Sequence, residues 1–93
     1  MDWKPYDPAW LVEWARANRC DPPWLPDALA RCTRALDGGP AYVYFVDPSD
    51  ANKPGAEWQR ESSLMLHHPA RGTLVVDVLT DRRVGGIEFL AKL

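Results

Sequence analysis

The sequence predicts an α+β domain, with two N-terminal helices packed on one face of a four-stranded antiparallel β-meander. The chain has 93 residues, enough for one domain and too few for two. Six of its nine prolines and four of its five tryptophans lie in residues 1–40. Apolar residues recur at helical spacing in that part and follow strand patterns after it. We therefore expect a single domain, 1–93, with a helical part over 1–39 and a sheet over 40–93.

The first helix is expected over residues 9–17. Asp7 can accept hydrogen bonds from the free amides of the first turn, and Pro8 suits the first helical position. Four apolar residues three and four apart form one helix face. They are Trp10, Leu11, Trp14 and Ala15.

The second helix is expected to begin at Pro26 and to run to Leu36. Asp37-Gly38-Gly39-Pro40 follows and supplies a left-handed stop. The apolar residues of this segment form one stripe at helical spacing, and they are Leu25, Ala28, Leu29, Cys32 and Leu36.

Four strands are expected after residue 40, over 41–46, 58–67, 73–79 and 84–90. The first is aromatic and β-branched and lies between a Gly-Pro and an Asp-Pro pair. The last two are joined by the short turn 80–83. With Asp81-Arg82 at the centre of that turn, the predicted cross-strand pairs are Val76 with Ile87, Leu74 with Phe89 and Val78 with Gly85.

The last hairpin has one uniformly apolar face and one mixed face. The helices are expected to cover the apolar face, because two layers then enclose one core. The mixed face is left for solvent or for a partner, and its residues are Val75, Asp77, Leu79, Val84, Gly86 and Glu88.

The same hairpin resembles a known family. Asp77 lies in an apolar strand, a turn with Asp81 follows, and Gly86-Ile87-Glu88 comes after Gly85. In the positions of Asp77 and of Gly86-Ile87-Glu88, and in the opening strand 41–46, residues 40–91 resemble the domain of unknown function 2283. Arg82 stands where that family usually has a turn glycine, Gly85 replaces an apolar residue and Leu79 replaces an aspartate. The resemblance implies no established activity; it implies a small bacterial or phage protein and, for some members, an antitoxin-like role toward a neighbouring toxin.

Charge and cysteine content narrow the partners and the compartment. Eleven basic and thirteen acidic residues give a net charge of −2, and no segment has a basic excess beyond Arg82-Arg83. Nucleic-acid binding is therefore disfavoured. No apolar run is long enough to span a membrane, and the N-terminus lacks the pattern of a secretory signal. We expect a cytoplasmic protein with reduced Cys20 and Cys32.

Neither a metal site nor a cofactor site is expected. Cys20 and Cys32 are too far apart for a zinc knuckle. The adjacent His67 and His68 would point to opposite faces of a strand. No glycine pair forms a phosphate-binding loop, and no nucleophile has a base at a suitable spacing.

Asp77 and Glu88 are the one candidate catalytic pair. They are expected to lie diagonally on the mixed face, close enough to share a water molecule or a cation, as metal-assisted hydrolysis requires. Surface ion pairs are a commoner use of such carboxylates. We therefore favour ion pairs with Arg60, Arg82 or Arg83 over catalysis.

The sequence best fits a small non-enzymatic protein-binding module, antitoxin-like, immunity-like or a phage-encoded regulator. Its partner would be another protein, such as a toxin or effector, or a second copy in a homodimer. A small metal-assisted hydrolase or nuclease that uses Asp77 and Glu88 is the alternative. Tyrosine, tryptophan and arginine are frequent interface anchors. The predicted partner-binding residues are Tyr42, Tyr44, Trp58, Asp77, Arg82, Arg83 and Glu88.

Overall fold

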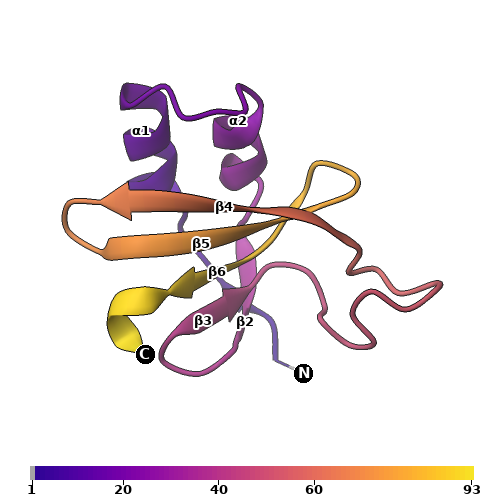
Figure 1. The fold of residues 1–93 in the computed structure, drawn as a ribbon. Helices are drawn as coiled ribbons and strands as arrows, with labels where there is room; N and C mark the ends of the chain where they lie inside the picture. The colour runs from indigo at the N-terminus through magenta and orange to yellow at the C-terminus, as the bar shows by residue number, and fades with distance from the viewer. Residues whose placement is uncertain (1) are drawn as a thin grey trace.

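The computed structural model describes residues 2–93, which form two α-helices, six β-strands and a C-terminal 3-10 helix (Figure 1). The α+β class predicted from the sequence is confirmed, but the sheet has six strands rather than four. The elements are β1 (Lys4–Pro5), α1 (Ala9–Ala17), α2 (Leu25–Ala30), β2 (Arg34–Asp37), β3 (Tyr42–Tyr44), β4 (Arg60–His68), β5 (Gly72–Leu79), β6 (Val84–Phe89) and η1 (Leu90–Lys92).

Helix α1 begins and ends where its sequence predicts. The backbone amide of Ala9 donates to Oδ1 of Asp7 at 3.0 Å, so Asp7 satisfies a free amide of the first turn. At the other end, the side-chain amide of Asn18 donates to the carbonyl of Trp14 at 2.8 Å. The helix buries one face, which consists of Leu11, Val12 and Ala15.

Both helices lie side by side on one face of the sheet, as the sequence predicts (Figure 1). The predicted pairs Val76–Ile87 and Leu74–Phe89 are both present in the hairpin of β5 and β6. Burial of one large aliphatic side chain contributes about 1.5–3 kcal/mol, so this layer is the main source of stability. The main core consists of Leu11, Val12, Ala15, Leu25, Ala28, Leu29, Cys32, Leu66, Leu74, Val76, Val84, Ile87 and Phe89.

The prediction that the second helix continues to Leu36 is wrong. Helix α2 ends at Ala30, and Arg34–Asp37 is strand β2. Leu36 pairs with Tyr44 in β3, while Ala35 pairs with Lys4 in β1. Sheet pairing on both sides therefore overrides the helical spacing that continues from α2, because local periodicity is a weak constraint beside tertiary contacts.

The predicted four-stranded meander is also wrong. Antiparallel neighbours give the order β1-β2-β3-β6-β5-β4, so only the last three strands form a meander. Strand β3 pairs with β6, with Tyr42 opposite Glu88, and the chain then crosses to the far edge to form β4. The long connection between β3 and β4, with Pro48 and Pro54, contains no tight turn that would hold these two strands together.

A bulge changes the register at the turn of the last hairpin. The ladder shifts between Asp77 and Val78, and Val78 pairs with Val84 rather than with the predicted Gly85. Val84 therefore belongs to the main core under the helices and not to the opposite face, where the sequence places it. Arg82 adopts φ 62° in this turn, a left-handed conformation that usually favours glycine.

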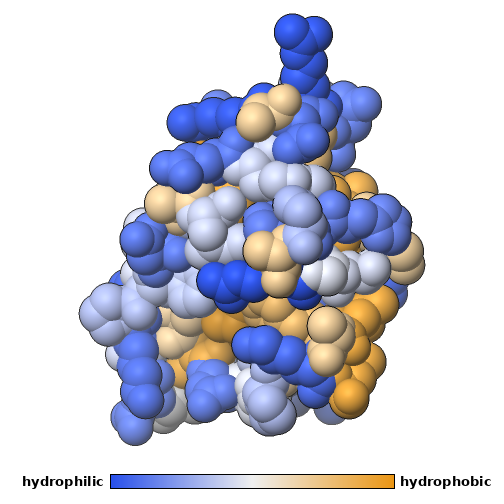
Figure 2. Space-filling model, turned by 90° about the vertical axis from the view of Figure 1, so that its left-hand side faces the viewer, coloured by the Kyte–Doolittle hydropathy of each residue, from blue (hydrophilic) through white to orange (hydrophobic). Residues whose placement is uncertain are grey.

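Few large apolar side chains are exposed. Seen from the side that carries the β4–β5 turn and η1, the surface is largely hydrophilic, with apolar side chains in its lower half (Figure 2). Among residues 2–93 the exposed large hydrophobic side chains are Met65 and Leu93, at 61% and 81%. Within that range, no helix combines the length and the apolarity needed to cross a membrane.

Candidate functional site

The sheet face opposite the helices brings together four of the predicted partner-binding residues and Val75. We call this surface the helix-free face and define it by Tyr42, Tyr44, Val75, Asp77 and Glu88. Side chains of directly paired residues share a face, so the strand register places them together. The pairs are Tyr42–Glu88, Tyr44–Gly86, Val75–Glu88 and Asp77–Gly86. Asp77 and Glu88 are thus diagonal neighbours, as the sequence predicts.

The carboxylate of Asp77 is held by three side chains. Its Oδ2 accepts a hydrogen bond from the hydroxyl of Tyr42, and its Oδ1 accepts one from the hydroxyl of Ser63 at 2.9 Å. Arg60 Nε donates to that hydroxyl at 3.1 Å and lies 3.9 Å from Asp77 Oδ1. The ion pair with Arg60 is one of those expected from the sequence. Since both oxygens are engaged, Asp77 serves as a fixed acceptor.

The hydroxyl of Tyr42 stays protonated and therefore remains a hydrogen-bond donor to this carboxylate. Burial raises the pKa of Tyr42 well above its ordinary value, and the hydrogen bond to Asp77 raises it further. The phenol therefore keeps its proton across the physiological range. Together Tyr42 and Asp77 join β3 to β5 across the intervening β6.

Glu88 differs from Asp77 in its surroundings. It is half-buried between Tyr42 and Val75. Among residues 2–93 its carboxylate forms neither a hydrogen bond nor an ion pair within the chain. The same residues contain no group of three His, Cys, Asp or Glu side chains placed to hold a metal ion. Glu88 is therefore an acceptor available to an incoming group.

Three aromatic rings follow one another along this side of the sheet. The rings of Tyr42 and Tyr44 are 4.4 Å apart, and Tyr44 meets Trp58 edge-on at 5.9 Å. Trp58 is only 5% exposed and closes a small second core with Val46 and Leu79. Of the predicted aromatic residues, Tyr42 and Tyr44 are thus half-exposed, while Trp58 supports them from within.

Two glycines of β6 make room for these rings. A Cβ on Gly86 would lie 2.7 Å from the Tyr42 ring and 2.7 Å from the carbonyl oxygen of Val43. A Cβ on Gly85 would lie 2.8 Å from the ring of Trp58. The absence of a side chain at Gly86 therefore lets the ring of Tyr42 lie over the strand.

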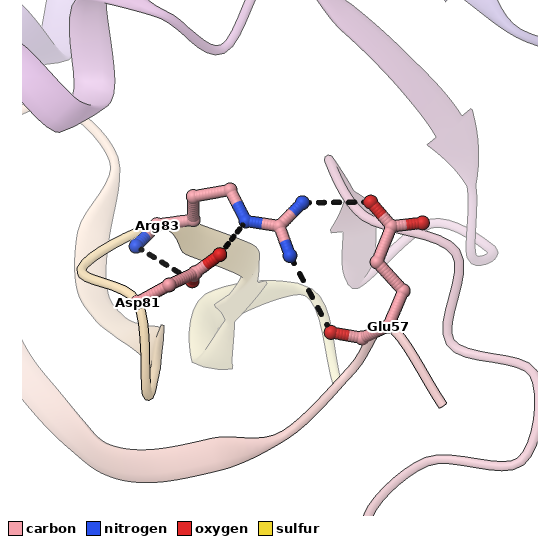
Figure 3. A network of polar contacts seen from close by, with 3 residues as sticks. All are labelled: Glu57, Asp81 and Arg83. Carbon is pink, nitrogen blue, oxygen red and sulfur yellow. Dashed lines mark hydrogen bonds and ion pairs between the residues drawn. The ribbon is translucent and has the colours of Figure 1, made fainter. Parts of the chain in front are cut away.

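Arg82 and Arg83 lie outside the helix-free face. Arg82 stacks over the ring of Trp24, in the connection between the helices, at 5.9 Å. Arg83 lies at the start of β6 and is held by two carboxylates (Figure 3). Its Nε donates to Asp81 Oδ2 at 2.5 Å and another of its nitrogens donates to Glu57 Oε1 at 2.7 Å. The hydrogen bond to Glu57 is the main reason that the pKa of Arg83 is raised.

Arg83 also borders an open groove of about 340 Å³ between α2 and the sheet. Arg31 and Arg34 line the same groove, and Arg34 lies 5.5 Å from the ring centre of Trp3. The apolar part of the lining includes Cys32, where burial raises the thiol pKa to about 12. Since five separate parts of the chain line the groove, no sequence motif points to it.

Sequence reasoning missed Ser63 as a part of the site, and it placed Val75 on the mixed face without naming it among the partner-binding residues. Ser63 lies opposite Asp77 in the β4–β5 ladder, and Val75 lies opposite Met65. The register of that pair of strands would have identified Ser63. Comparison with known protein families, with curated proteins and with solved structures finds no match to this chain.

Proposed function

We propose that the protein is a non-enzymatic protein-binding module and that its partner docks on the helix-free face. The observation that carries this proposal is the contrast between Asp77 and Glu88. Asp77 is saturated by Tyr42, Ser63 and Arg60, whereas Glu88 forms no polar contact within the described chain. The face thus combines fixed polar groups with one carboxylate that is free to bind.

Preorganisation supports binding at this face. The hydroxyl bridge from Tyr42 to Asp77 fixes a tyrosine that is stacked on a second tyrosine at 4.4 Å. Aromatic side chains that are already ordered lose little entropy when a partner packs on them. The lack of a helix over this face keeps it open to another protein.

The chemistry of the face describes the expected partner. Glu88 would form an ion pair with a lysine or arginine of the partner, and Val75 beside it would pack against an apolar side chain. The net charge of −2 also favours a basic partner. A toxin or effector encoded next to this protein would fit the antitoxin-like role that the hairpin resemblance implies.

Metal-assisted hydrolysis by Asp77 and Glu88 has less support. A general acid or a metal ligand needs a free oxygen, and both oxygens of Asp77 already accept hydrogen bonds. Titration with Mg²⁺ or Mn²⁺ separates the two functions. A cation-dependent rise in melting temperature that disappears in Asp77→Asn would favour the hydrolase.

Co-expression with the product of the neighbouring gene tests the binding function. We expect a complex that Val75→Lys or Glu88→Lys weakens at least about tenfold in a calorimetric titration. Glu13→Lys is the matched control, because Glu13 is exposed on α1 and the charge change is the same as in Glu88→Lys. Absence of a complex, or equal weakening by the control, would contradict docking on this face.

A further inference from the structure

The two edges of the sheet are built very differently. One edge is β1, a strand of two residues that consists of a lysine and a proline, Lys4 and Pro5. Short edge strands, lysine and proline are common devices that prevent pairing with another chain. The other edge is β4, nine residues long, which pairs with β5 on one side only within residues 2–93. Its free side presents unpaired backbone amides and carbonyls.

Strand β4 lacks protective residues over most of its length. The bulge that interrupts its ladder lies near its start, between Arg60 and Ser62, and the pairing is regular from there to His68. The segment 62–68 contains no proline, lysine, arginine, aspartate or glutamate. Such a run on an exposed edge is a template for another strand.

The pattern of polar and apolar residues in this segment is the same in both directions from Met65. Two serines precede three apolar residues, and two histidines follow them, in the order Ser62-Ser63-Leu64-Met65-Leu66-His67-His68. An antiparallel pair of identical strands brings each residue opposite its mirror position. A sequence with mirror-symmetric polarity therefore matches a second copy of itself.

We propose that two copies of this chain pair antiparallel through β4, with Met65 on the two-fold axis, to form one continuous sheet. In this register Leu64 of each copy lies opposite Leu66 of the other, and Met65 lies opposite Met65. Serines face histidines on either side, where hydroxyl and imidazole groups can form hydrogen bonds. Moving the axis to Leu64 or to Leu66, a register shift of two residues, would instead place Leu66 opposite Ser62 or Leu64 opposite His68.

The exposure of Met65 and Leu64 favours a second copy of this chain over a partner strand of another sequence. Met65 is 61% exposed, unusual for a large apolar side chain in the middle of a strand. Leu64 is half-exposed at the margin of the main core, beside the buried Leu66. Pairing with a second copy covers both side chains and extends the main core across the axis.

No like charges face each other in this arrangement. Strand β4 ends at His68 and the chain turns over 69–71, so Arg60 and Glu61 of one copy lie beside that turn of the second copy. The paired segment 62–68 itself carries no lysine, arginine, aspartate or glutamate. Charge therefore permits self-pairing, although the chain as a whole is acidic.

Sedimentation velocity over a range of concentrations tests the dimer. We expect the wild-type protein to reach twice its 10.5 kDa mass as concentration rises. Met65→Lys places two like charges on the axis and should leave a monomer with unchanged circular dichroism. Ala51→Lys, in an exposed loop, adds the same charge and should still dimerise. A wild-type monomer at every concentration, or a dimer that survives Met65→Lys, would overturn the proposal.

Disulfide trapping tests the register. In a Cys20→Ser background, Met65→Cys places two thiols opposite each other, where antiparallel Cα atoms lie about 4.5–5.5 Å apart and a disulfide can form. Oxidation should give covalent dimers from this variant and few from Ser63→Cys, whose opposite residue is His67. Preferential trapping of the Ser63 variant would overturn the Met65-centred register.

Glu88→Lys separates the dimer from the proposed docking face. Glu88 lies on β6, two strands away from the free edge of β4, whereas Val75 lies directly opposite Met65. The Glu88 variant should therefore dimerise normally, and loss of its dimer would contradict pairing through the edge. Loss of partner binding in the same variant, with the dimer intact, would separate the two surfaces.

Discussion

The two faces of the sheet reach stability by different physical routes. On the helix-covered face, aliphatic side chains such as Leu74 and Ile87 are almost completely buried. On the helix-free face, Tyr42 and Asp77 remain partly accessible and are fixed by hydrogen bonds. Burial of apolar side chains contributes most of the stability of the fold, whereas substitutions on the hydrogen-bonded face lower the free energy of unfolding less. This difference is the reason that we propose the second face for binding.

Neighbouring residues of β5 provide the largest expected contrast. Leu74 is fully buried under the helices, so Leu74→Ala should lower the free energy of unfolding by about 2–5 kcal/mol. Val75 points to the helix-free face, and Val75→Ala should cost less than about 1.5 kcal/mol. Urea denaturation followed by tryptophan fluorescence measures both. Equal losses would mean that the two faces contribute equally to stability.

Alkaline pH should lower the free energy of unfolding strongly, through Cys32 in the main core and Tyr42 on the helix-free face. Burial raises the thiol pKa of Cys32 from 9.0 to about 12. The unfolded chain therefore loses this proton first, and stability falls as pH rises from about 9, by about 1.4 kcal/mol per pH unit. On the helix-free face, the raised pKa of Tyr42 acts with the same sign above about pH 10.

Single variants separate the two contributions. Cys32→Ala should lose most of the decline that begins near pH 9, leaving the smaller part that comes from the raised pKa of the Cys20 thiol, while Tyr42→Phe should lose only the part above about pH 10. The measurement is the free energy of unfolding by urea at several pH values. A wild-type protein whose stability is constant from pH 8 to pH 11 would contradict both assignments.

The glycines of β6 test how closely the aromatic rings approach the sheet. In Gly86→Ala the new methyl group meets both the Tyr42 ring and the backbone carbonyl of Val43, so we expect a loss of about 1–3 kcal/mol. Gly85→Ala meets only the side chains of Trp58 and Leu79, which can shift more easily. Thermal unfolding should therefore rank Gly86→Ala as the more harmful substitution. The reverse order would show that the Trp58 cluster is the more rigid.

The Arg83 network should give the smallest effect. Arg83 and Glu57 are substantially exposed, and surface ion pairs contribute about 0–1 kcal/mol. We expect Glu57→Gln to lower stability by less than about 1 kcal/mol and to lose that effect in high salt. A larger loss, insensitive to salt, would show that the groove beside Arg83 is part of the structural core.

Local patterns predict part of this fold and part of its site. Strands β4 to β6 and helix α1 follow from alternation and helical spacing, which are properties of adjacent residues. Strand β2 was missed because the spacing of Leu36 continues that of α2, and its pairing with Tyr44 is a tertiary contact. Strand β1, with two residues, is too short to show a pattern.

In the candidate site, too, local patterns predict some features, and tertiary contacts determine the others. Asp77 and Glu88 were placed together correctly, because the register of one hairpin relates them. Arg82 and Arg83, predicted as partner-binding residues beside them, lie away from this pair, since residues of a turn project in different directions: one stacks on Trp24 and the other binds Glu57. The buried position of Trp58 depends on the course of a long loop, which no local pattern determines.

The pairing of β3 with β6 has a consequence for the order of folding. Tyr42 and Glu88 are adjacent in space but are separated by nearly half of the chain. Contacts of such large sequence separation form slowly, because a long loop must close before they are made. The hairpins of β4, β5 and β6, like that of β2 and β3, close through short turns, so we expect these two units to form before β3 pairs with β6. During synthesis on the ribosome, β3 can therefore pair with β2 at once but lacks its second partner until Phe89 has been translated.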